Sequence, residues 1–564
     1  MKDMITMNIK YKKWSRVLAI VLFSCPLLLA PCTFTSCSEW DDHYENSADG
    51  AAGGTLWEQL KANPQVSDFC DVLEQTKVYR MHKKTPVSYA DILSGGQAFT
   101  VMAPVNGTFN KDSLLQLVQT VVGDSSVEKS FVQNQLSRQL VSSNSNANKM
   151  LLLNMKHLEM ANGKVDDVPI ATANAKAGNG ILHVIEKALP YKHNLFEMFC
   201  DNPELSVIGD NLRRFNEDVF DATASVSNGV VDGVPVYVDS VVYERNRLLE
   251  AIGLLRDEDS TYLVVAPTTE GWNEAYAEAS QYFQFDETIE KRDSLQQYYT
   301  LRALLEDAVF NMTDQKNVND SLISVPYIRS NQQYAKGKHI YHVFQKPWAE
   351  GGILYGATPL ECSNGILYTT PKWSFSPMDT YFKELTIEGE AQHLMFQYDE
   401  KRTVYNVRQL AGDSISNGSY MRINAKGQTD NWDVTYRLNN TLSGSYDMYV
   451  VVLPKYVYDA TAPKADLPCK FKANINYIDA QGKAQTFACK IDNKTEFTTN
   501  PARIDTVLIA SGFQFPACNY GQDNTSVSIN IQCSVGSRQN NSYSREFYLD
   551  CILVRPHNSK SEEQ

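Results

Sequence analysis

The sequence lacks the short motifs that mark the common classes of enzyme. It contains no HExxH, GxSxG or Walker phosphate-binding motif, and no GxGxxG follows a predicted strand. It also contains no CxxC pair, the usual signature of zinc and thiol redox sites. We therefore expect a protein without catalytic residues, without a bound metal and without a cofactor.

Basic side chains are in the minority as well. There are 52 Lys and Arg residues against 66 Asp and Glu residues, a formal net charge of −14. This balance argues against a nucleic-acid partner, because phosphate backbones are bound mainly through Lys and Arg. Histidine is scarce, with 9 residues, and its close pair His339 and His342 stands at i and i+3 on a predicted strand. The two rings then face opposite sides, so we expect no shared metal.

The N-terminus lacks an apolar run long enough for a mature transmembrane helix. Val17–Ala30 is apolar but too short to span a bilayer, and it follows the basic residues Lys10, Lys12, Lys13 and Arg16. A basic segment followed by a short apolar one is typical of an export signal.

A cysteine follows this signal at a position that suits lipidation. Phe34-Thr35-Ser36-Cys37 resembles the lipobox of bacterial lipoproteins, whose cysteine is acylated and becomes the first mature residue. Cys32 is the rival, but Pro31 suits the peptidase less well than Ser36 does. We predict a lipoprotein signal peptide over residues 1–37 with lipidation at Cys37; the alternative is a plain secretory peptide cut near Ala30. The acidic residues that follow resemble the signal that takes Bacteroidetes lipoproteins to the outside of the outer membrane: Glu39, Asp41 and Asp42.

Residues 38–54 are polar and rich in Gly, Ala and Ser, which is typical of a flexible tether. The chain as a whole is 43% hydrophobic and 21% charged, as folded globular proteins are. Its 564 residues leave room for about three or four domains.

Two stretches of the chain repeat each other. TLWEQLKANPQVSDFCDVLE at 55–74 aligns with NLFEMFCDNPELSVIGDNLR at 194–213, including the pairs Asn63-Pro64 and Asn202-Pro203. Asn caps helices and Pro suits the first helical position, so each stretch predicts two short helices broken at Asn-Pro. Apolar residues at i, i+3 and i+7 predict a buried face in each second helix: Val66, Phe69 and Leu73, and Leu205, Ile208 and Leu212.

The repeat continues into two pairs of predicted strands. FTVMAPVNGTF at 99–109 matches TYLVVAPTTEGW at 261–272, and NGILHVIEKAL at 179–189 matches NGILYTTPKWS at 364–374. The order is kept while the offset grows, so we predict two copies of one domain, the second with insertions. These motifs resemble the fasciclin (FAS1) family. The resemblance implies two α+β domains, at 55–190 and, in divergent form, at 191–378, each a wedge of β-sheet flanked by helices.

FAS1 domains elsewhere serve adhesion and matrix binding, and some carry a Tyr-His pair associated with receptor contact. The corresponding region here, residues 134–142, has no such pair. In the second copy Tyr368 stands in place of His183, and Pro371 falls within the expected closing strand. His183 lies between apolar neighbours on a strand, so we interpret it as a buried, hydrogen-bonded residue rather than a ligand.

The last third changes to strict strand alternation. CKFKANINY at 469–477 places Lys470, Lys472, Asn474 and Asn476 on one face and apolar residues on the other. Similar alternating or denser apolar strands recur between turns, which predicts an all-β sandwich or jelly roll over 379–556, followed by a tail at 557–564. Cys469, Cys533 and Cys551 fall within the apolar pattern and are interpreted as buried free thiols.

This region also resembles the galactose-binding-like and carbohydrate-binding jelly rolls, through DNWDVTYRLNNTLSGSYDMYVVVLP and the terminal FYLDCILVRP. The resemblance implies a glycan ligand. Trp432 and Tyr436 are the candidate ligand-binding residues, because an aromatic plane can stack on a sugar ring. The alternative for Trp432 is a place in the core, as is common for large aromatic side chains.

These observations predict a surface-exposed, outer-membrane lipoprotein for adhesion or binding that faces the cell exterior. Its expected partners are the membrane through the lipid anchor, a glycan and, by resemblance to Bacteroidetes lipoproteins, a TonB-dependent transporter complex. A second candidate function is structural, with protein contacts only. A third is a glycan-cleaving enzyme with its site in the sandwich or in residues 285–350. Such an enzyme needs a pair of carboxylates, and the 66 acidic residues offer too many pairs for the sequence to select one.

Overall fold

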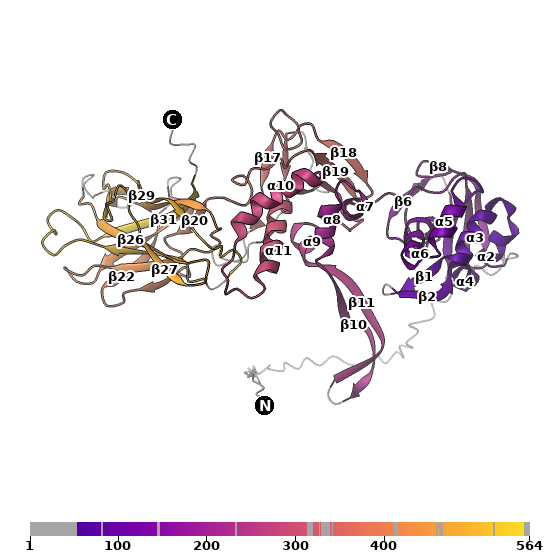
Figure 1. Ribbon diagram of the computed structural model, residues 1–564, viewed down its shortest axis with the longest axis horizontal. Coiled ribbons are helices and arrows are strands. Elements are labelled where there is room, and N and C mark those ends of the chain that lie inside the picture. The colour runs from indigo at the N-terminus through magenta and orange to yellow at the C-terminus, as the bar shows by residue number, and fades with distance from the viewer. Residues whose placement is uncertain are drawn as a thin grey trace, which may run out of the picture.

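The computed structural model describes residues 54–557, apart from 81–82, 144–146, 232–233, 313–319, 326, 329–338, 341, 411–414, 458–460, 462–465 and 523–524. The predicted signal peptide with Cys32 and Cys37 and nearly all of the predicted tether lie outside these residues. Figure 1 shows three bodies in a row, two units of mixed helix and sheet and then a β-sandwich. Within the described part of the chain, no helix combines the length and the apolar character that a bilayer crossing needs.

The first unit begins with the predicted broken helix pair. A capping box between Thr55 and Glu58 starts α2 (Leu56–Ala62), and the Asn63 side chain caps the single turn η1 (Pro64–Val66) before α3 (Ser67–Gln75). The predicted face of this second helix is confirmed as core, since its three apolar residues are fully buried. The unit continues with β1 (Lys77–Arg80), β2 (Lys83–Ser88), α4 (Tyr89–Ser94), α5 (Lys111–Leu117), α6 (Val121–Val127), η2 (Glu128–Val132) and η3 (Gln133–Gln135).

A seven-stranded sheet carries the two predicted strand motifs of this unit. Strands β3 (Phe99–Pro104) and β9 (Gly180–Ile185) are parallel neighbours, paired from Phe99↔Gly180 to Pro104↔Ile185. The full order is β4-β3-β9-β8-β7-β6-β5. The remaining strands are β4 (Leu136–Ser137), β5 (Asn148–Leu151), β6 (His157–Ala161), β7 (Lys164–Val165) and β8 (Val168–Ala177).

The second unit repeats this arrangement. A capping box between Asn194 and Glu197 starts α7 (Leu195–Asp201), and α8 (Ser206–Arg213) follows the second Asn-Pro pair. Strands β12 (Tyr262–Pro267) and β19 (Gly365–Thr370) are parallel neighbours in a sheet of order β13-β12-β19-β18, which matches β4-β3-β9-β8 of the first unit. Since β19 has the same length as β9, Pro371 ends this strand and does not shorten it. The unit also contains α9 (Arg247–Ile252), α10 (Thr269–Ser280), η4 (Gln281–Phe283), α11 (Arg292–Leu305), β13 (Val309–Asn311), β14 (Ser321–Ile323), β15 (Tyr327–Ile328), β16 (His339–Ile340), β17 (Val343–Gln345) and β18 (Thr358–Cys362).

The Asn-Gly pair has the same role in both units. The side-chain oxygen of Asn179 accepts a hydrogen bond from the Leu56 backbone N–H at 2.6 Å, and that of Asn364 accepts one from Leu195 at 2.9 Å. Each Asn therefore ties the first helix to the start of the closing strand. A Cβ at Gly180 or Gly365 would lie 2.0 or 1.9 Å from a carbonyl oxygen of the neighbouring strand, and both glycines have positive φ. The close backbone approach therefore requires glycine.

The units differ most in one hairpin. Between the second helix and the strand motif, the first unit has the short pair β1 and β2, whereas the second unit has β10 (Asn216–Val231) and β11 (Val234–Asn246). This long pair forms a two-stranded sheet of its own and projects away from the body of the unit (Figure 1). We call it the ribbon.

The C-terminal region is a sandwich of two sheets, as the alternation predicts. One sheet has the order β22-β23-β31-β25-β29 with β20 beside β31, and the other has the order β21-β24-β30-β26-β27 with β28 beside β26. Their inward side chains form one hydrophobic core. The strands are β20 (Leu385–Glu388), β21 (Met395–Tyr398), β22 (Thr403–Gln409), β23 (Ser419–Ala425), β24 (Asp433–Arg437), β25 (Ser445–Val452), β26 (Lys470–Ile478), β27 (Ala484–Ala488), β28 (Phe497–Thr498), β29 (Asp505–Gln514), β30 (Ser528–Cys533) and β31 (Phe547–Pro556).

The second unit contributes to the core of the sandwich. Phe283 and Phe285, which follow α10, are 1% and 4% exposed and belong to the core cluster of the sandwich. The backbone is shared too, because the Cys518 N–H donates to the carbonyl of Gln284 at 2.6 Å. The predicted boundary between 378 and 379 is therefore a boundary in sequence but not in packing.

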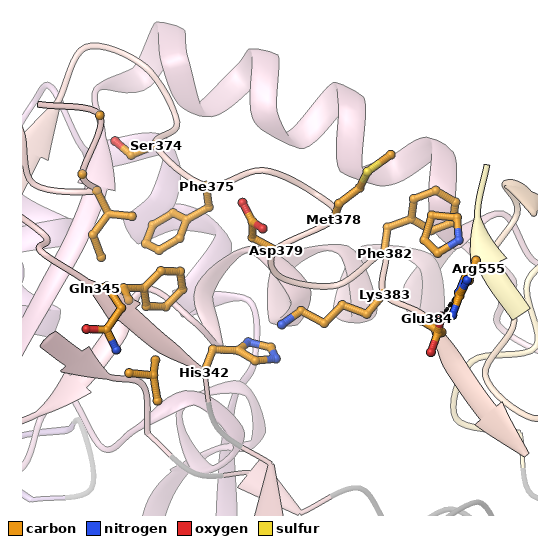
Figure 2. A pocket seen from close by; sticks show the side chains of 16 residues that line it. His342, Gln345, Ser374, Phe375, Met378, Asp379, Phe382, Lys383, Glu384 and Arg555 are labelled. Atoms are coloured by element: carbon orange, nitrogen blue, oxygen red, sulfur yellow. Dashed lines mark hydrogen bonds and ion pairs between the residues drawn. The ribbon is translucent and has the colours of Figure 1, made fainter. Parts of the chain in front are cut away.

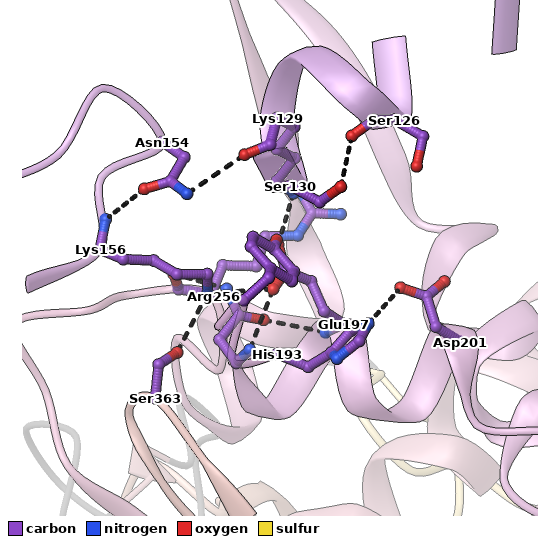
Figure 3. Close-up of polar contacts among 12 residues, drawn as sticks. Ser126, Lys129, Ser130, Asn154, Lys156, His193, Glu197, Asp201, Arg256 and Ser363 are labelled. Carbon is purple, nitrogen blue, oxygen red and sulfur yellow. Dashed lines mark hydrogen bonds and ion pairs between the residues drawn. The ribbon is translucent and has the colours of Figure 1, made fainter. Parts of the chain in front are cut away.

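Buried charges hold the first unit against the second (Figure 3). The Lys156 ammonium group of the first unit lies 3.1 Å from a carboxylate oxygen of Glu197 and 2.8 Å from one of Glu258, and it donates to the Ser363 hydroxyl at 3.1 Å. Lys129 lies 2.5 Å from the other oxygen of Glu197. Burial alone would raise the pKa of Glu197, but the two ammonium groups hold it at about 2. We call this group of residues the ionic joint.

Candidate functional site

The two aromatic residues predicted to bind a ligand are both buried. Trp432 and Tyr436 are each 0% exposed and belong to the core of the sandwich. The Trp432 indole N–H donates to the Arg545 carbonyl at 2.9 Å, and the Tyr436 hydroxyl donates to the Gly389 carbonyl at 2.7 Å. Neither ring offers a face to a sugar, so this prediction is wrong and the core alternative for Trp432 is correct.

The same strand presents polar side chains on its other face. Because side chains alternate along a strand, the neighbours of the buried aromatics on β24 point out of the sandwich: Asp433, Thr435 and Arg437. Strand β30 pairs with β24, β26 pairs with β30, and both carry polar residues at the matching positions. The result is a set of polar side chains opposite the core, of which Thr435 and Ser528 are buried, and we call it the polar face.

Register places these residues in three rows across the sheet. The first row pairs Lys472 with Gln532 and Gln532 with Asp433, the second runs from Asn474 through Asn530 and Thr435 to Gln397, and the third from Thr486 through Asn476 and Ser528 to Arg437. The rows therefore extend over five neighbouring strands.

Hydrogen bonds fix the side chains of the polar face. The Asn530 amide donates to Asp433 at 2.7 Å and to the Thr435 hydroxyl at 3.0 Å, and the Gln532 amide donates to the second Asp433 oxygen at 2.6 Å. In the third row the Asn476 amide donates to the Ser528 hydroxyl at 3.1 Å, while its oxygen accepts from Thr486 at 3.0 Å. The groups are thus oriented before any ligand arrives.

Asp433 is the charged centre of this network. Burial raises the pKa of its carboxyl group, and the hydrogen bonds from Asn530 and Gln532 act in the opposite direction. A carboxylate accepts hydrogen bonds only, whereas the amides around it both donate and accept. Sugar hydroxyl groups also do both, so the polar face is chemically matched to them.

An exposed aromatic ring lies at the β21 edge of the polar face. Phe396 is 41% exposed, and the Arg437 guanidinium lies over its ring at 4.7 Å from the centroid. The pairing of β21 with β24 shifts register between Met395 and Gln397. An exposed ring beside oriented polar groups is an arrangement that can take both the apolar face and the hydroxyl groups of a sugar.

Part of the polar face follows from the sequence pattern alone. The alternation of CKFKANINY had already placed Lys472, Asn474 and Asn476 together, opposite the core. The outward positions of VSINIQC are Asn530 and Gln532. What the sequence did not reveal was which strands are neighbours, and that adjacency assembles the rows.

The other sequence-predicted residues have structural roles. His183 is 0% exposed; its Nε2 lies 2.9 Å from the Val141 carbonyl, and its Nδ1 accepts from the Asn174 backbone N–H. The interpretation as a buried, hydrogen-bonded histidine is confirmed. His342 lies 2.5 Å from Asp307, while the side chain of His339 is outside the described residues. In the described part of the chain, no group of three or more His, Cys, Asp or Glu residues could hold a metal ion, and the eight described cysteines are free thiols.

Three solved structures show the range of similar proteins. The first is endo-1,4-β-D-xylanase 10B of Clostridium thermocellum, a carbohydrate-binding module 22 with a glycoside hydrolase 10 module complexed with xylohexaose, at 12% identity, 29% of this chain, 26% of that chain and a TM-score of 0.19. The second is a FAS1 domain pair of the insect cell adhesion molecule fasciclin I. It is 12% identical, the match covers 50% of this chain and 90% of that chain, and the TM-score is 0.19. The third is a family 35 carbohydrate-binding module from Clostridium thermocellum. It is 14% identical, the match covers 30% of this chain and 97% of that chain, and the TM-score is 0.15. The chain thus spans about a quarter of the xylanase chain, and TM-scores this low carry no argument about its ligand.

Family comparison gives a result for the first unit. No curated protein matches the chain. Residues 65–191 match the family model described as Fasciclin domain, over well under half of the chain. The resemblance predicted for the first copy is thereby confirmed over residues 65–191.

Proposed function

We propose that the protein is a non-catalytic, surface-exposed binding protein whose sandwich binds glycans through the polar face. The observation that carries this proposal is the hydrogen-bonded network of Asp433, Asn530 and Gln532 on the outer side of the sheet. A network that is already oriented loses little conformational entropy when it exchanges contacts with a ligand. Its spread over neighbouring strands suits an extended saccharide chain.

The two N-terminal units serve adhesion or spacing in this proposal, and the second is a divergent fasciclin domain. Support for the second assignment comes from its sheet order and its Asn-Gly contacts, which match those of the first unit. The fasciclin match of residues 65–191 supports a role in adhesion.

The proposed location is the outer membrane, with Cys37 acylated and the folded part facing the exterior. The support is sequence alone, namely the lipobox-like Phe34-Thr35-Ser36-Cys37 and the acidic residues after it. Several buried acyl chains would hold the protein durably, since each methylene adds about 0.8 kcal/mol of membrane affinity. A TonB-dependent transporter complex is the proposed assembly partner, and pull-down of the acylated protein from its native membrane tests this.

Glycan binding is tested with a soluble form that begins at Ser38, first on a glycan array and then by calorimetry with the best glycan. Asn530→Ala removes the donor that orients Asp433 and Thr435, and we expect it to weaken binding about tenfold, the equivalent of about one hydrogen bond. Asn406→Ala is the matched control, because Asn406 is an exposed residue on the other sheet. Equal affinities for the two variants would overturn the assignment of the polar face.

A structural role through protein contacts is the second candidate function. The ribbon favours it, because an isolated two-stranded sheet is marginally stable by itself and gains from pairing with another chain. A silent glycan array together with a protein partner in the pull-down would favour this candidate over glycan binding.

A further inference from the structure

A cleft of about 910 Å³ lies between the second unit and the end of the sandwich (Figure 2). This volume is close to the upper end of the range of about 300–1,000 Å³ that is usual for small-molecule sites. Three segments line the cleft: residues 342–345 with 351–353 of the second unit, residues of the linker over 374–384, and Arg555 with Pro556 at the end of β31. We call it the joint cleft.

Buried contacts hold its walls in place. Phe382 of the linker is 4% exposed, and its ring packs at 4.6 Å from Tyr282 of the second unit and at 5.0 Å from Tyr446 of the sandwich, measured between centroids. The shared core at Phe283 and Phe285 fixes the same two bodies. The cleft is therefore preformed, and a ligand would not have to close it.

The two ends of the cleft are apolar. At one end the rings of Phe344 and Phe375 pack edge to face at 5.2 Å between centroids, next to Ile353. At the other end Met378 is 41% exposed near Phe382. These surfaces suit the C–H faces of a ligand rather than its polar groups.

The middle of the cleft is polar. Figure 2 shows Asp379, Lys383 and His342 around it, and the exposed Gln345 also lines the cleft. Carboxylate oxygens accept hydrogen bonds, ammonium groups donate them and amides do both. A hydroxyl group can satisfy each of these partners in turn.

The charges of the lining balance. The lining carries two cationic groups, Lys383 and Arg555, and two carboxylates, Glu384 and Asp379, and Arg555 pairs with Glu384. An anion would meet carboxylates and a cation would meet basic groups, at a cost in each case. The lining therefore favours a ligand that is uncharged and rich in hydroxyl groups.

We propose that the joint cleft is a second binding site, separate from the polar face, which takes the end or a short stretch of a neutral saccharide. The proposal shares only the class of ligand with the proposed function of the polar face. The two sites use different residues and can fail independently.

The test measures binding of maltohexaose, cellohexaose, xylohexaose and mannohexaose by calorimetry and saturation-transfer NMR, with hexagalacturonate as the anionic comparison. The protein is the full chain from Ser38. The double variant Asp379→Ala/Gln345→Ala removes two exposed polar groups of the cleft, and Ser374→Trp fills its rim. Asp293→Ala on α11 is the matched control, since that carboxylate is 89% exposed.

We expect at least one neutral hexasaccharide to bind, with affinity lowered at least tenfold by both cleft variants and unchanged by Asp293→Ala. The Asn530→Ala variant of the polar face should leave this component intact. The proposal is overturned if none of the four neutral sugars binds, if hexagalacturonate binds more tightly than all of them, or if only Asn530→Ala affects binding. In the last case the polar face stands alone as the glycan site.

Discussion

Lys156 is the single residue on which the ionic joint depends most. We predict that Lys156→Ala destabilises the contact between the first two units by about 3–5 kcal/mol, because it leaves the buried Glu258 without its ammonium partner and Glu197 with Lys129 alone. Urea unfolding and limited proteolysis between the units measure the loss. Lys164→Ala, on an exposed position of the same unit, is the control and should change little. A wild-type-like unfolding curve for Lys156→Ala would contradict this account.

The ionic joint should also depend on acidic pH. The folded pKa of Glu197, about 2, lies below its usual 4.5, so its contribution is present above about pH 4.5 and is lost as pH falls toward 2. The difference in unfolding free energy between wild type and Lys156→Ala should therefore shrink between pH 5 and pH 2.5. A difference that stays constant over this range would speak against the charge of Glu197 as its source.

Asp550 should have the opposite pH dependence. Burial raises its pKa to about 7, Glu388 and Glu390 add to the effect, and a hydrogen bond from the Ser416 backbone opposes it. A carboxyl whose folded pKa is raised contributes stability that is present below about pH 3.8 and lost as pH rises through 7. We predict that Asp550→Asn raises stability at pH 8, by about 4 kcal/mol at most, and has little effect at pH 4. Thermal unfolding at the two pH values decides, and a gain of equal size at both would refute the titration of Asp550.

Residue type alone misplaced the candidate site by one position along β24. Aromatic rings were chosen because they suit sugars, but the strand alternation that the sequence itself displays turns Trp432 and Tyr436 into the core. It turns Asp433 and Thr435 outward. The burial of each ring depends on the opposite sheet, which no local pattern encodes.

At the scale of elements, the repeated motifs predicted the fasciclin-type unit and the parallel strand pair well, because each motif has a local physical cause. Asn caps a helix, and glycine permits close backbone approach. The two strands are apolar at nearly every position because both of their faces are covered. The ribbon was not predicted as a projecting element. The ribbon is a longer form of the β1–β2 hairpin of the first unit. The growing offset between the repeated motifs shows where residues are inserted but not what structure they form.

The ribbon should be removable without loss of the fold. We predict that joining Asp218 to Glu244 through an Asn-Gly turn, which deletes residues 219–243, changes the melting temperature of the second unit only slightly. The two residues are paired neighbours at the base of the ribbon, so a tight turn fits there. Calorimetry on the shortened and full chains measures this. Unfolding of the second unit in the shortened chain would show that the ribbon supports its core.

At the scale of the whole molecule, the second unit and the sandwich should unfold together. We predict that Phe285→Ala lowers the stability of the sandwich by about 3–5 kcal/mol, the usual result of emptying a buried aromatic site. Phe396→Ala, at 41% exposure, is the control and should cost far less. Sandwich strands that keep their amide-exchange protection in Phe285→Ala would contradict the shared core. For the same reason, residues 379–556 expressed alone should expose apolar surface.

The continuity of packing at both joints bears on how many copies can act together. The ionic joint on one side of the second unit and Phe283 and Phe285 on the other side fix the sandwich relative to the first unit. With the anchoring and glycan binding proposed above, the effective concentration of one glycan strand for several copies would be set by their lateral spacing. Avidity for long polysaccharides would then rise steeply with the surface density of the protein.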